Sequence, residues 1–374
     1  MQTIKGLGRL GLKLLFVAVL LVPLIATGNG VAAAAGGSAG AVYMMTNEAS
    51  GNRVAVFDRA ADGTLSAAGT FATGGLGNGG GLGSQGSLVL DQDSRWLFAV
   101  NAGSNEVSVF AVRPDGLALA DKVASGGLMP VSLTVHGRLL YVLNAGGSGN
   151  ITGFVIGQHG KLSPLAGSTR PLSNGGVSAA PGPAQIQFSP DGELLAVTEK
   201  TTNLIDTYEI QNGWAQGPKT HTSSGATPFG FDFDKRGTLV VSEAAGSALS
   251  SYKVSENDFH VVGASVPDGQ GAACWVVITQ NGKYAYTANA HSGSISSYGL
   301  SPDGKLKLLN GLAGVTGNNS SPIDMALSNN SHYLYELASG AHALDAFRVQ
   351  PNGSLMSVGS VGGLPASAVG LAAR

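Results

Sequence analysis

Two carboxylates and a set of polar or aromatic side chains are the residues of this sequence best suited to chemistry. The carboxylates, Glu199 and Glu243, each close an apolar segment typical of a β-strand, and they are the candidate catalytic residues. The candidate ligand-binding residues stand at similar segment ends: Asn101, Asn144, Gln185, Asn289, Trp275 and Asp324. Carboxylates in a concave, amide-lined mouth can act as acid and base, bind a polyhydroxylated ligand or hold a divalent cation.

A repeated β-hairpin positions these side chains, and residues 182–197 show it most clearly. Ile186 and Phe188 alternate with polar residues, Pro190-Asp191-Gly192 supplies a turn, and the apolar run 194–197 returns. Further copies recur roughly every 45 to 50 residues, at 87–101, 130–144, 228–243, 275–289 and 322–335. A fixed period of this length predicts stacked supersecondary units rather than one wound sheet.

Each hairpin is followed by a third alternating segment, and these segments end in an aromatic residue and a hydrophobe. They lie at 107–112, 151–156, 204–210, 249–254, 295–300 and 344–349. A Gly-containing turn such as 302–304 then precedes a fourth, short outer strand. Four antiparallel strands per repeat, innermost first, are typical of a propeller blade.

The two ends of the chain supply complementary parts of one more blade. Residues 364–370 resemble an innermost strand without a successor, whereas 41–46 and 54–58 resemble second and third strands without a predecessor. Joining them closes the ring and removes two exposed sheet edges. The sequence therefore predicts an all-β, seven-bladed β-propeller of four-stranded antiparallel blades, with the N- and C-terminal strands sharing one blade; eight blades are the alternative.

Counting outward from the hairpin turns predicts which residues lie opposite each other at the strand ends. The predicted pairs are Gln185 with Glu199, Ser132 with Asn144, Ser87 with Asn101, Trp275 with Asn289, Gly230 with Glu243, and Asp324 with Ala338. We expect these residues, with Asn47 or Glu48 from the split blade, to collect at one mouth of the central channel. The alternative is that they only cap strands, because Asn and Asp bond readily to local backbone.

Composition excludes several classes of function. The net charge is −2 with only 21 Lys and Arg residues, so nucleic acid is not an expected partner.

No cluster with metal-ligand spacing occurs, and we expect neither a metal nor another cofactor. A single cysteine, Cys274, allows no intramolecular disulfide and is expected to be a small buried hydrophobe. The glycine-rich insertion 74–86 contains, at residues 75–80, the spacing of a dinucleotide-binding loop, but a strand follows instead of a helix, so a flexible interblade loop is predicted. Residues 165–182 form a second long loop.

The first 35 residues have the pattern of a signal peptide. Lys5, Arg9 and Lys13 form a basic start, residues 14–26 an apolar run, and 33–35 a small-residue cleavage region. We therefore expect a secreted or periplasmic monomer whose residues 36–374 form a single propeller domain without a membrane span. A retained membrane anchor is the alternative, although the run is short and Pro23 interrupts it.

The repeat resembles the lactonase family of seven-bladed propellers, which includes phosphogluconolactonase-type enzymes and relatives labelled carboxymuconate cyclases. The resemblance rests on Ser-Pro-Asp-Gly turns, a Tyr/Ala-x-Val second strand and a Val-x-Val-Phe/Tyr third strand, and it covers 41–373. Phosphogluconolactonase-type members tend to carry Gly-Pro-Arg-His and then Asn-Glu. Here the corresponding residues are Gly182-Pro183-Ala184-Gln185 and Thr198-Glu199, and a further Arg of such enzymes falls near residues 271–272.

The resemblance thus retains Glu199 and lacks the Arg and the His, which makes phosphorylated lactones poor candidate substrates. It implies a lactonase-like hydrolase acting on an uncharged lactone, with Glu199 or Glu243 activating water and Asn144 or Gln185 polarising the carbonyl. The alternative is a non-catalytic propeller that binds a sugar, a peptide or a partner protein at the channel mouth or through its long loops. The expected small-molecule ligand is therefore a lactone or is sugar-like.

Overall fold

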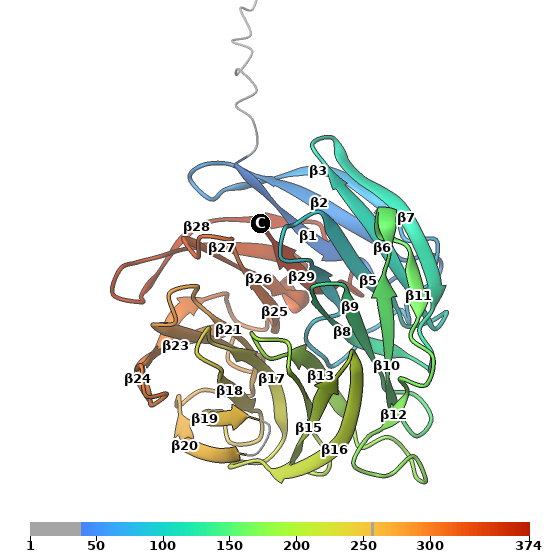
Figure 1. The fold of residues 1–374 in the computed structure, drawn as a ribbon. Helices are drawn as coiled ribbons and strands as arrows, with labels where there is room; N and C mark the ends of the chain where they lie inside the picture. The colour runs from blue at the N-terminus through green and yellow to red at the C-terminus, as the bar shows by residue number, and fades with distance from the viewer. Residues whose placement is uncertain (1–38, 256–257) are drawn as a thin grey trace, which may run out of the picture. The chain divides into compact units, whose positions relative to one another are not determined.

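Seven small antiparallel sheets stand around a common axis in the computed structural model (Figure 1). The structure describes residues 39–255 and 258–374, which belong to one compact unit. The predicted signal peptide, residues 1–35, lies outside the described residues, and so does the membrane-anchor alternative. No helix within the described ranges has the length and apolar character needed to cross a membrane.

We number the split blade as blade 1 and the others in chain order, and list strands from the channel outwards. Blade 1 contains β29 (Val369–Ala373), β1 (Gly40–Met45), β2 (Arg53–Arg59) and β3 (Leu65–Ala72). Blade 2 contains β4 (Leu88–Leu90), β5 (Trp96–Asn101), β6 (Glu106–Arg113) and β7 (Gly116–Ala124). Blade 3 contains β8 (Pro130–His136), β9 (Leu139–Asn144), β10 (Asn150–Ile156), β11 (Leu162–Pro164) and β12 (Arg170–Pro171).

The remaining blades follow the same order. Blade 4 contains β13 (Pro183–Phe188), β14 (Leu194–Glu199), β15 (Leu204–Gln211) and β16 (Trp214–Thr222). Blade 5 contains β17 (Pro228–Phe233), β18 (Thr238–Glu243), β19 (Ala248–Ser255) and β20 (Asp258–Pro267). Blade 6 contains β21 (Ala273–Ile278), β22 (Tyr284–Asn289), β23 (Ser294–Leu300) and β24 (Leu306–Val315). Blade 7 contains β25 (Pro322–Leu327), β26 (Tyr333–Ala338), β27 (Ala343–Val349) and β28 (Leu355–Gly362).

The hairpin of blade 4 shows why these sequences form strands. Ile186 lies opposite Val197 in the β13–β14 ladder, as the alternation predicts. In the turn between the strands, the Ser189 hydroxyl donates to Asp191 at 2.5 Å and accepts from the Leu194 N–H at 3.0 Å. The Ser-Pro-Asp-Gly sequence therefore closes the hairpin with its own side chains, which is why it recurs at turns.

The chain ends close the ring as predicted. Strand β29 pairs with β1 in antiparallel register, with Val42 opposite Ala373 and Met45 opposite Val369, and Figure 1 places the C-terminus beside β1. The innermost strand nevertheless begins five residues later than the sequence predicted, at Val369 instead of Leu364. Residues 364–368 form a turn instead, in which the Ser367 hydroxyl donates to the Thr46 carbonyl at 2.7 Å.

The outer strands are longer than predicted. In six blades they span 8 to 10 residues, and only in blade 3 is the outer edge split between the short strands β11 and β12. These strands carry few buried residues, so their hydrophobic pattern is weak and the sequence underestimates their length.

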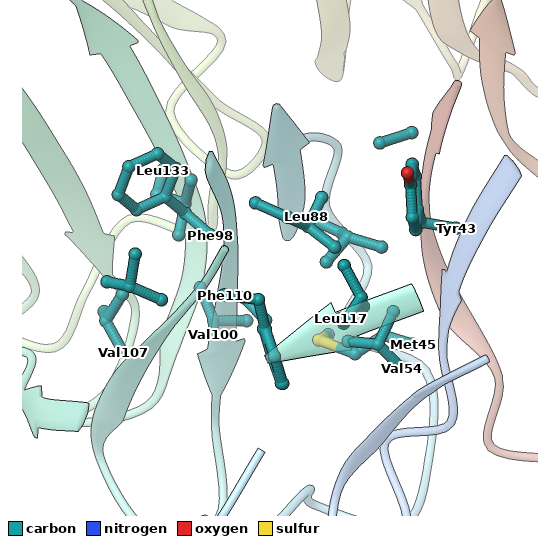
Figure 2. Close-up of a cluster of buried hydrophobic side chains, with 14 of the residues drawn as sticks. Tyr43, Met45, Val54, Leu88, Phe98, Val100, Val107, Phe110, Leu117 and Leu133 are labelled. Atoms are coloured by element: carbon teal, nitrogen blue, oxygen red, sulfur yellow. The ribbon is translucent and has the colours of Figure 1, made fainter. Parts of the chain in front are cut away.

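The hydrophobic core lies between the blades. Figure 2 shows one cluster, in which Tyr43 of blade 1, Leu88 and Phe98 of blade 2 and Leu133 of blade 3 belong to one buried group. Cys274 is free and buried, which confirms its expected role as a small core residue. Because each blade buries one face against the next, the stability of every blade depends on its neighbours.

Candidate functional site

Residues 74–86 close the mouth of the channel at which the inner strands begin. The Ser84 hydroxyl donates to the Val131 carbonyl of β8 at 2.8 Å, and the Gln85 N–H donates to the Ala184 carbonyl of β13 at 3.1 Å. The Gln85 side chain exchanges two hydrogen bonds with Val276 of β21, at 2.7 and 2.9 Å. This segment, which we call the plug, is therefore bonded to three inner strands. The segment is an interblade loop, as predicted, but these bonds hold it in place.

Two glycines show why the plug fits. A Cβ on Gly77 would lie 2.1 Å from the Asn47 backbone, and a Cβ on Gly230 of β17 would lie 2.2 Å from the Gln85 side-chain oxygen. Lys200 also connects the plug to blade 4. Its ammonium donates a hydrogen bond to the Gly83 carbonyl at 2.5 Å and lies 5.0 Å from the centre of the Phe229 ring. The glycine run thus serves close packing against other blades.

The predicted opposite pairs at the strand ends are wrong. Glu199 lies opposite Pro183, and Gln185 lies opposite Thr198, because a β-bulge adds one residue to β13. Bulges displace the pairs in β8, β17, β21 and β25 in the same way, and in blade 2 the carbonyl of Ser87 accepts from Val100. Counting from a turn assumes an unbroken ladder, and the bulges break it.

Glu199 lies at the end of β14 and is fully buried. Its carboxylate accepts from the Ser173 N–H at 3.1 Å, the Ser173 hydroxyl at 2.5 Å and the Thr202 hydroxyl at 2.6 Å. Asp206 of β15 faces it, and burial together with the charge of Glu199 raises the pKa of Asp206. Glu199 is therefore bonded to the connector from blade 3 and has no contact with solvent.

The other candidates at the ends of second strands have the same environment. Glu243 accepts from the hydroxyls of Ser250 and Ser265, and it is 1 % exposed. The fully buried asparagines bond to nearby polar side chains, with partner distances of 2.8 to 3.1 Å: Asn101 to Ser108 and Asn52, Asn144 to Asn150, and Asn289 to Ser294 and Ser296. These residues fasten strand ends to connectors, and the structure does not gather them around one open cavity.

Gln185 faces the channel but is also bonded to protein. Its amide donates to the Phe231 carbonyl at 2.9 Å and accepts from the Phe231 N–H at 2.7 Å, so it fills the open edge of β17. Asp232 does the same for β21 by accepting from the Ile278 N–H at 2.8 Å. Burial raises the pKa of Asp232 to about 6. Channel-facing side chains thus satisfy the backbone of the neighbouring inner strand.

Trp275 and Asp324 are brought together at a small pocket beside the plug. The pocket has a volume of about 240 Å³. Its lining comes from the plug (81–84), the starts of β21 and β25, Ser339 and the turn before β29, and it contains no Lys, Arg or His. We call it the mouth pocket. Below it, a channel cavity of about 420 Å³ reaches the hairpin turns of the inner strands.

Asp324 lines both cavities. It occupies a β-bulge in β25 with a φ of +51°, a left-handed conformation that Asp tolerates better than most residues. Its carboxyl faces the backbone N–H groups of Gly370 and Met325, yet burial raises its pKa to about 8. It is thus an acid that exchanges its proton close to neutral pH, at the boundary between a pocket and a channel.

A second unusual carboxyl, Glu336 of β26, lies away from both cavities. It is fully buried, neither of its oxygens has a hydrogen-bond partner, and Asp345 lies opposite it in β27. Burial raises its pKa well above the usual range, and the charge of Asp345 adds to this effect. The Glu336 carboxyl has a lower pKa in the unfolded chain than in the folded protein. Above that lower pKa, the unfolded chain releases the proton while the folded protein keeps it.

We expect Glu336→Gln to stabilise the fold increasingly as pH rises. The wild type must take up a proton to fold, which costs about 1.4 kcal/mol for each pH unit above the unfolded-state pKa. This penalty grows until the folded-state carboxyl itself ionises. Urea melts at pH 5 and pH 9 measure the effect, with the exposed Glu193→Gln as control. An equal difference between variant and wild type at both pH values would contradict it.

The structure also contains polar partners that reasoning from sequence missed. At four strand ends, the residue seven positions later bonds back to the strand-end residue or faces it: Ser108 after Asn101, Asp206 after Glu199, Ser250 after Glu243, and Ser296 after Asn289. This spacing is visible in the sequence and could have revealed the ties. Within the described ranges, no three or more His, Cys, Asp or Glu side chains gather in a way that could hold a metal ion.

A closed ring of seven four-stranded blades with a small mouth pocket defines the class as a seven-bladed β-propeller. The chain matches the family model described as "Lactonase, 7-bladed beta-propeller" over residues 37–177, 166–248 and 240–346. The chain therefore belongs to this lactonase family, which confirms the resemblance noted in the sequence.

Individual relatives are more distant. The "Probable 6-phosphogluconolactonase" of Arthroderma benhamiae is 23% identical over 250 residues, which cover 59% of this chain and only 63% of that relative. The periplasmic gluconolactonase PpgL of Pseudomonas aeruginosa is similar in structure, with a TM-score of 0.68 at 17% identity, covering 89% of this chain and 98% of that one. A protein from Lactobacillus plantarum is similar in structure with a TM-score of 0.71 at 15% sequence identity, and the match covers 90% of this chain and 99% of that one. These structural likenesses show the fold alone.

Proposed function

We propose that this chain hydrolyses an uncharged lactone in the mouth pocket. Membership of the lactonase family supports a hydrolytic role. The observation that carries the choice of substrate is the lining of the pocket, which contains no Lys, Arg or His to hold a phosphate or carboxylate. The volume of about 240 Å³ lies below the usual range of pockets for drug-sized ligands, so it favours a small ring.

Asp324 is the group that we assign to proton transfer. In its ionised form it removes a proton from a water molecule as the water oxygen attacks the lactone carbonyl carbon. The bond between that carbon and the ring oxygen then breaks, and the proton returns to the ring oxygen to give the hydroxy acid. A carboxylate with a pKa of about 8 is a stronger base than an ordinary one, which suits this step. Trp275 provides an apolar wall for the ring.

The test is a pH-stat assay on glucono-δ-lactone, δ-valerolactone and 6-phosphogluconolactone, with spontaneous hydrolysis subtracted. We expect turnover of the two uncharged lactones, and a loss of about 10²-fold or more in Asp324→Asn. Because the base must be ionised, the enzyme-dependent rate should rise with pH through about 8. Asp232→Asn is the matched control, since Asp232 is also a channel carboxyl with a raised pKa but does not line the mouth pocket.

Three outcomes would contradict parts of the proposal. Faster turnover of the phosphorylated lactone would overturn the substrate class. Activity retained in Asp324→Asn but lost in Glu199→Gln would assign the base to Glu199, the carboxylate predicted from the sequence. A rate that falls with rising pH would make Asp324 a general acid instead.

A non-catalytic binding protein is the second candidate, and the surroundings of Glu199 and Glu243 favour it. Both carboxylates are buried and saturated with hydroxyl donors, so neither is ready to activate a water molecule. In this case no lactone is hydrolysed above background, yet an uncharged lactone or sugar raises the Tm, and Trp275→Ala abolishes that rise.

A further inference from the structure

The buried carboxyl pair of blade 4 differs from every other strand-end site in the ring. Glu199 and Asp206 are both 0 % exposed, and neither oxygen of Asp206 has a hydrogen-bond donor within bonding geometry. No Lys or Arg in the described ranges forms an ion pair with either carboxylate. Two carboxylates side by side in a buried place repel each other unless a positive charge or a proton lies between them.

The equivalent positions in three other blades show what is unusual here. There, the residue seven positions after the strand end is a serine, and its hydroxyl completes the hydrogen bonding: Ser108, Ser250 and Ser296. Glu243 with Ser250 is the direct counterpart of Glu199 with Asp206. Blade 4 therefore has an acceptor-only group where the fold elsewhere uses a donor, and the surplus oxygens face Glu199.

Two hydroxyl oxygens also lie beside the Glu199 carboxylate. The Ser173 hydroxyl lies 2.5 Å and the Thr202 hydroxyl 2.6 Å from one Glu199 oxygen. Together with the two carboxylates they supply six oxygen atoms, two from each carboxylate and one from each hydroxyl. Thr202 is exposed, so the cluster lies directly beneath the surface.

A second carboxyl pair provides a contrast within the same chain. Glu336 and Asp345 also lie side by side, but Glu336 lies opposite Met325 of β25, which belongs to a buried apolar cluster. No hydroxyl donates to Glu336. The charge arrangement is similar in the two pairs. In blade 7 one hydroxyl, that of Ser360, bonds to Asp345 and none bonds to Glu336, whereas in blade 4 two hydroxyls bond to Glu199.

We propose that Glu199 and Asp206 bind one divalent cation, with Ca²⁺ as the best fit, and that Ser173, Thr202 and water complete its shell. Ca²⁺ takes six to eight oxygen ligands from carboxylates, hydroxyls and water, and tolerates irregular geometry. The ion links β14 and β15 to the connector 165–182 through Ser173. This site stabilises blade 4 and is independent of the proposed lactone hydrolysis.

Thermal melts of the EDTA-treated full chain test the site. We expect saturating CaCl₂ to raise the Tm by roughly 5 °C, and isothermal titration calorimetry to show one Ca²⁺ per chain. MgCl₂ should give a smaller rise, because Mg²⁺ demands stricter octahedral geometry. An unchanged Tm and no heat of binding would overturn the proposal and leave a pair that only shares a proton.

Asp206→Ser is the decisive variant because it installs the arrangement found beside Glu243. We expect it to fold, to keep the Ser173 connection and to lose the response to Ca²⁺. Glu336→Gln, which removes the other buried pair, should keep the full response. If Asp206→Ser folds poorly, Asp206→Asn in the same calorimetric titration serves instead. A Ca²⁺ response that survives in the folded Asp206 variant would show that the ion binds elsewhere.

Discussion

Deletion of residues 364–374 is expected to remove most of the stability of the propeller. The segment contains β29, the innermost strand of blade 1, which pairs with β1 from Val42 to Met45. Val369 and Leu371 are 4 % and 6 % exposed, and burying each such side chain contributes roughly 1.5 to 3 kcal/mol. A typical domain has a free energy of unfolding of only about 5 to 15 kcal/mol. The loss of these side chains and the opening of the ring therefore remove most of it.

Circular dichroism melts of the truncated and full-length chains provide the measurement. We expect either no cooperative transition or a Tm that is lower by well over 10 °C. Each kcal/mol of lost stability lowers the Tm by roughly 2 to 4 °C. Removal of Arg374 alone is the control, since it leaves β29 intact and should have a small effect. An unchanged Tm in the long truncation would contradict the role of β29 in closing the ring.

Tyr141→Ala is expected to cost roughly 3 to 5 kcal/mol, as for other large aromatic side chains removed from a core. Tyr141 of β9 is fully buried and packs against Phe188 of blade 4, with ring centres 5.9 Å apart. Its hydroxyl donates to the Gly213 carbonyl at 2.9 Å and accepts from the Ala215 N–H at 2.8 Å. One side chain therefore joins blade 3 to both the inner and the outer part of blade 4.

Tyr141→Phe separates packing from hydrogen bonding, because it keeps the ring and removes only the hydroxyl. It should cost about 1 to 3 kcal/mol, the penalty for leaving a buried backbone group unpaired. Urea denaturation of both variants gives the two free energies. If Phe and Ala at this position destabilise the fold equally, packing between the blades contributes less than we infer.

The candidate site was only partly accessible from sequence. In the sequence, Trp275 and Asp324 are candidates because they open inner strands, and the structure places both at the mouth pocket. Glu199 and Glu243 are candidates because they close second strands, and the structure buries both beneath connectors. Their role as bases stays a prediction. The two groups looked alike in the sequence because strand position says where a residue lies along a blade, and not what covers it.

Local patterns determined the fold of this protein. Alternating apolar residues, Ser-Pro-Asp-Gly turns and a recurring spacing specify each blade within about 50 residues, and the unmatched chain ends specify ring closure. Each of these signals acts over a short stretch, so it can be read without knowing the rest of the structure.

The tertiary structure alone decided what the mouth of the channel contains. Gln85 bonds to Val276, 191 residues away, and so converts a glycine-rich loop into a plug. Bulges in the inner strands shift the predicted pairs, and one of them turns Asp324 toward both cavities. Such contacts arise only after seven blades have closed into a ring, because only then do residues that are far apart in the sequence line the same channel.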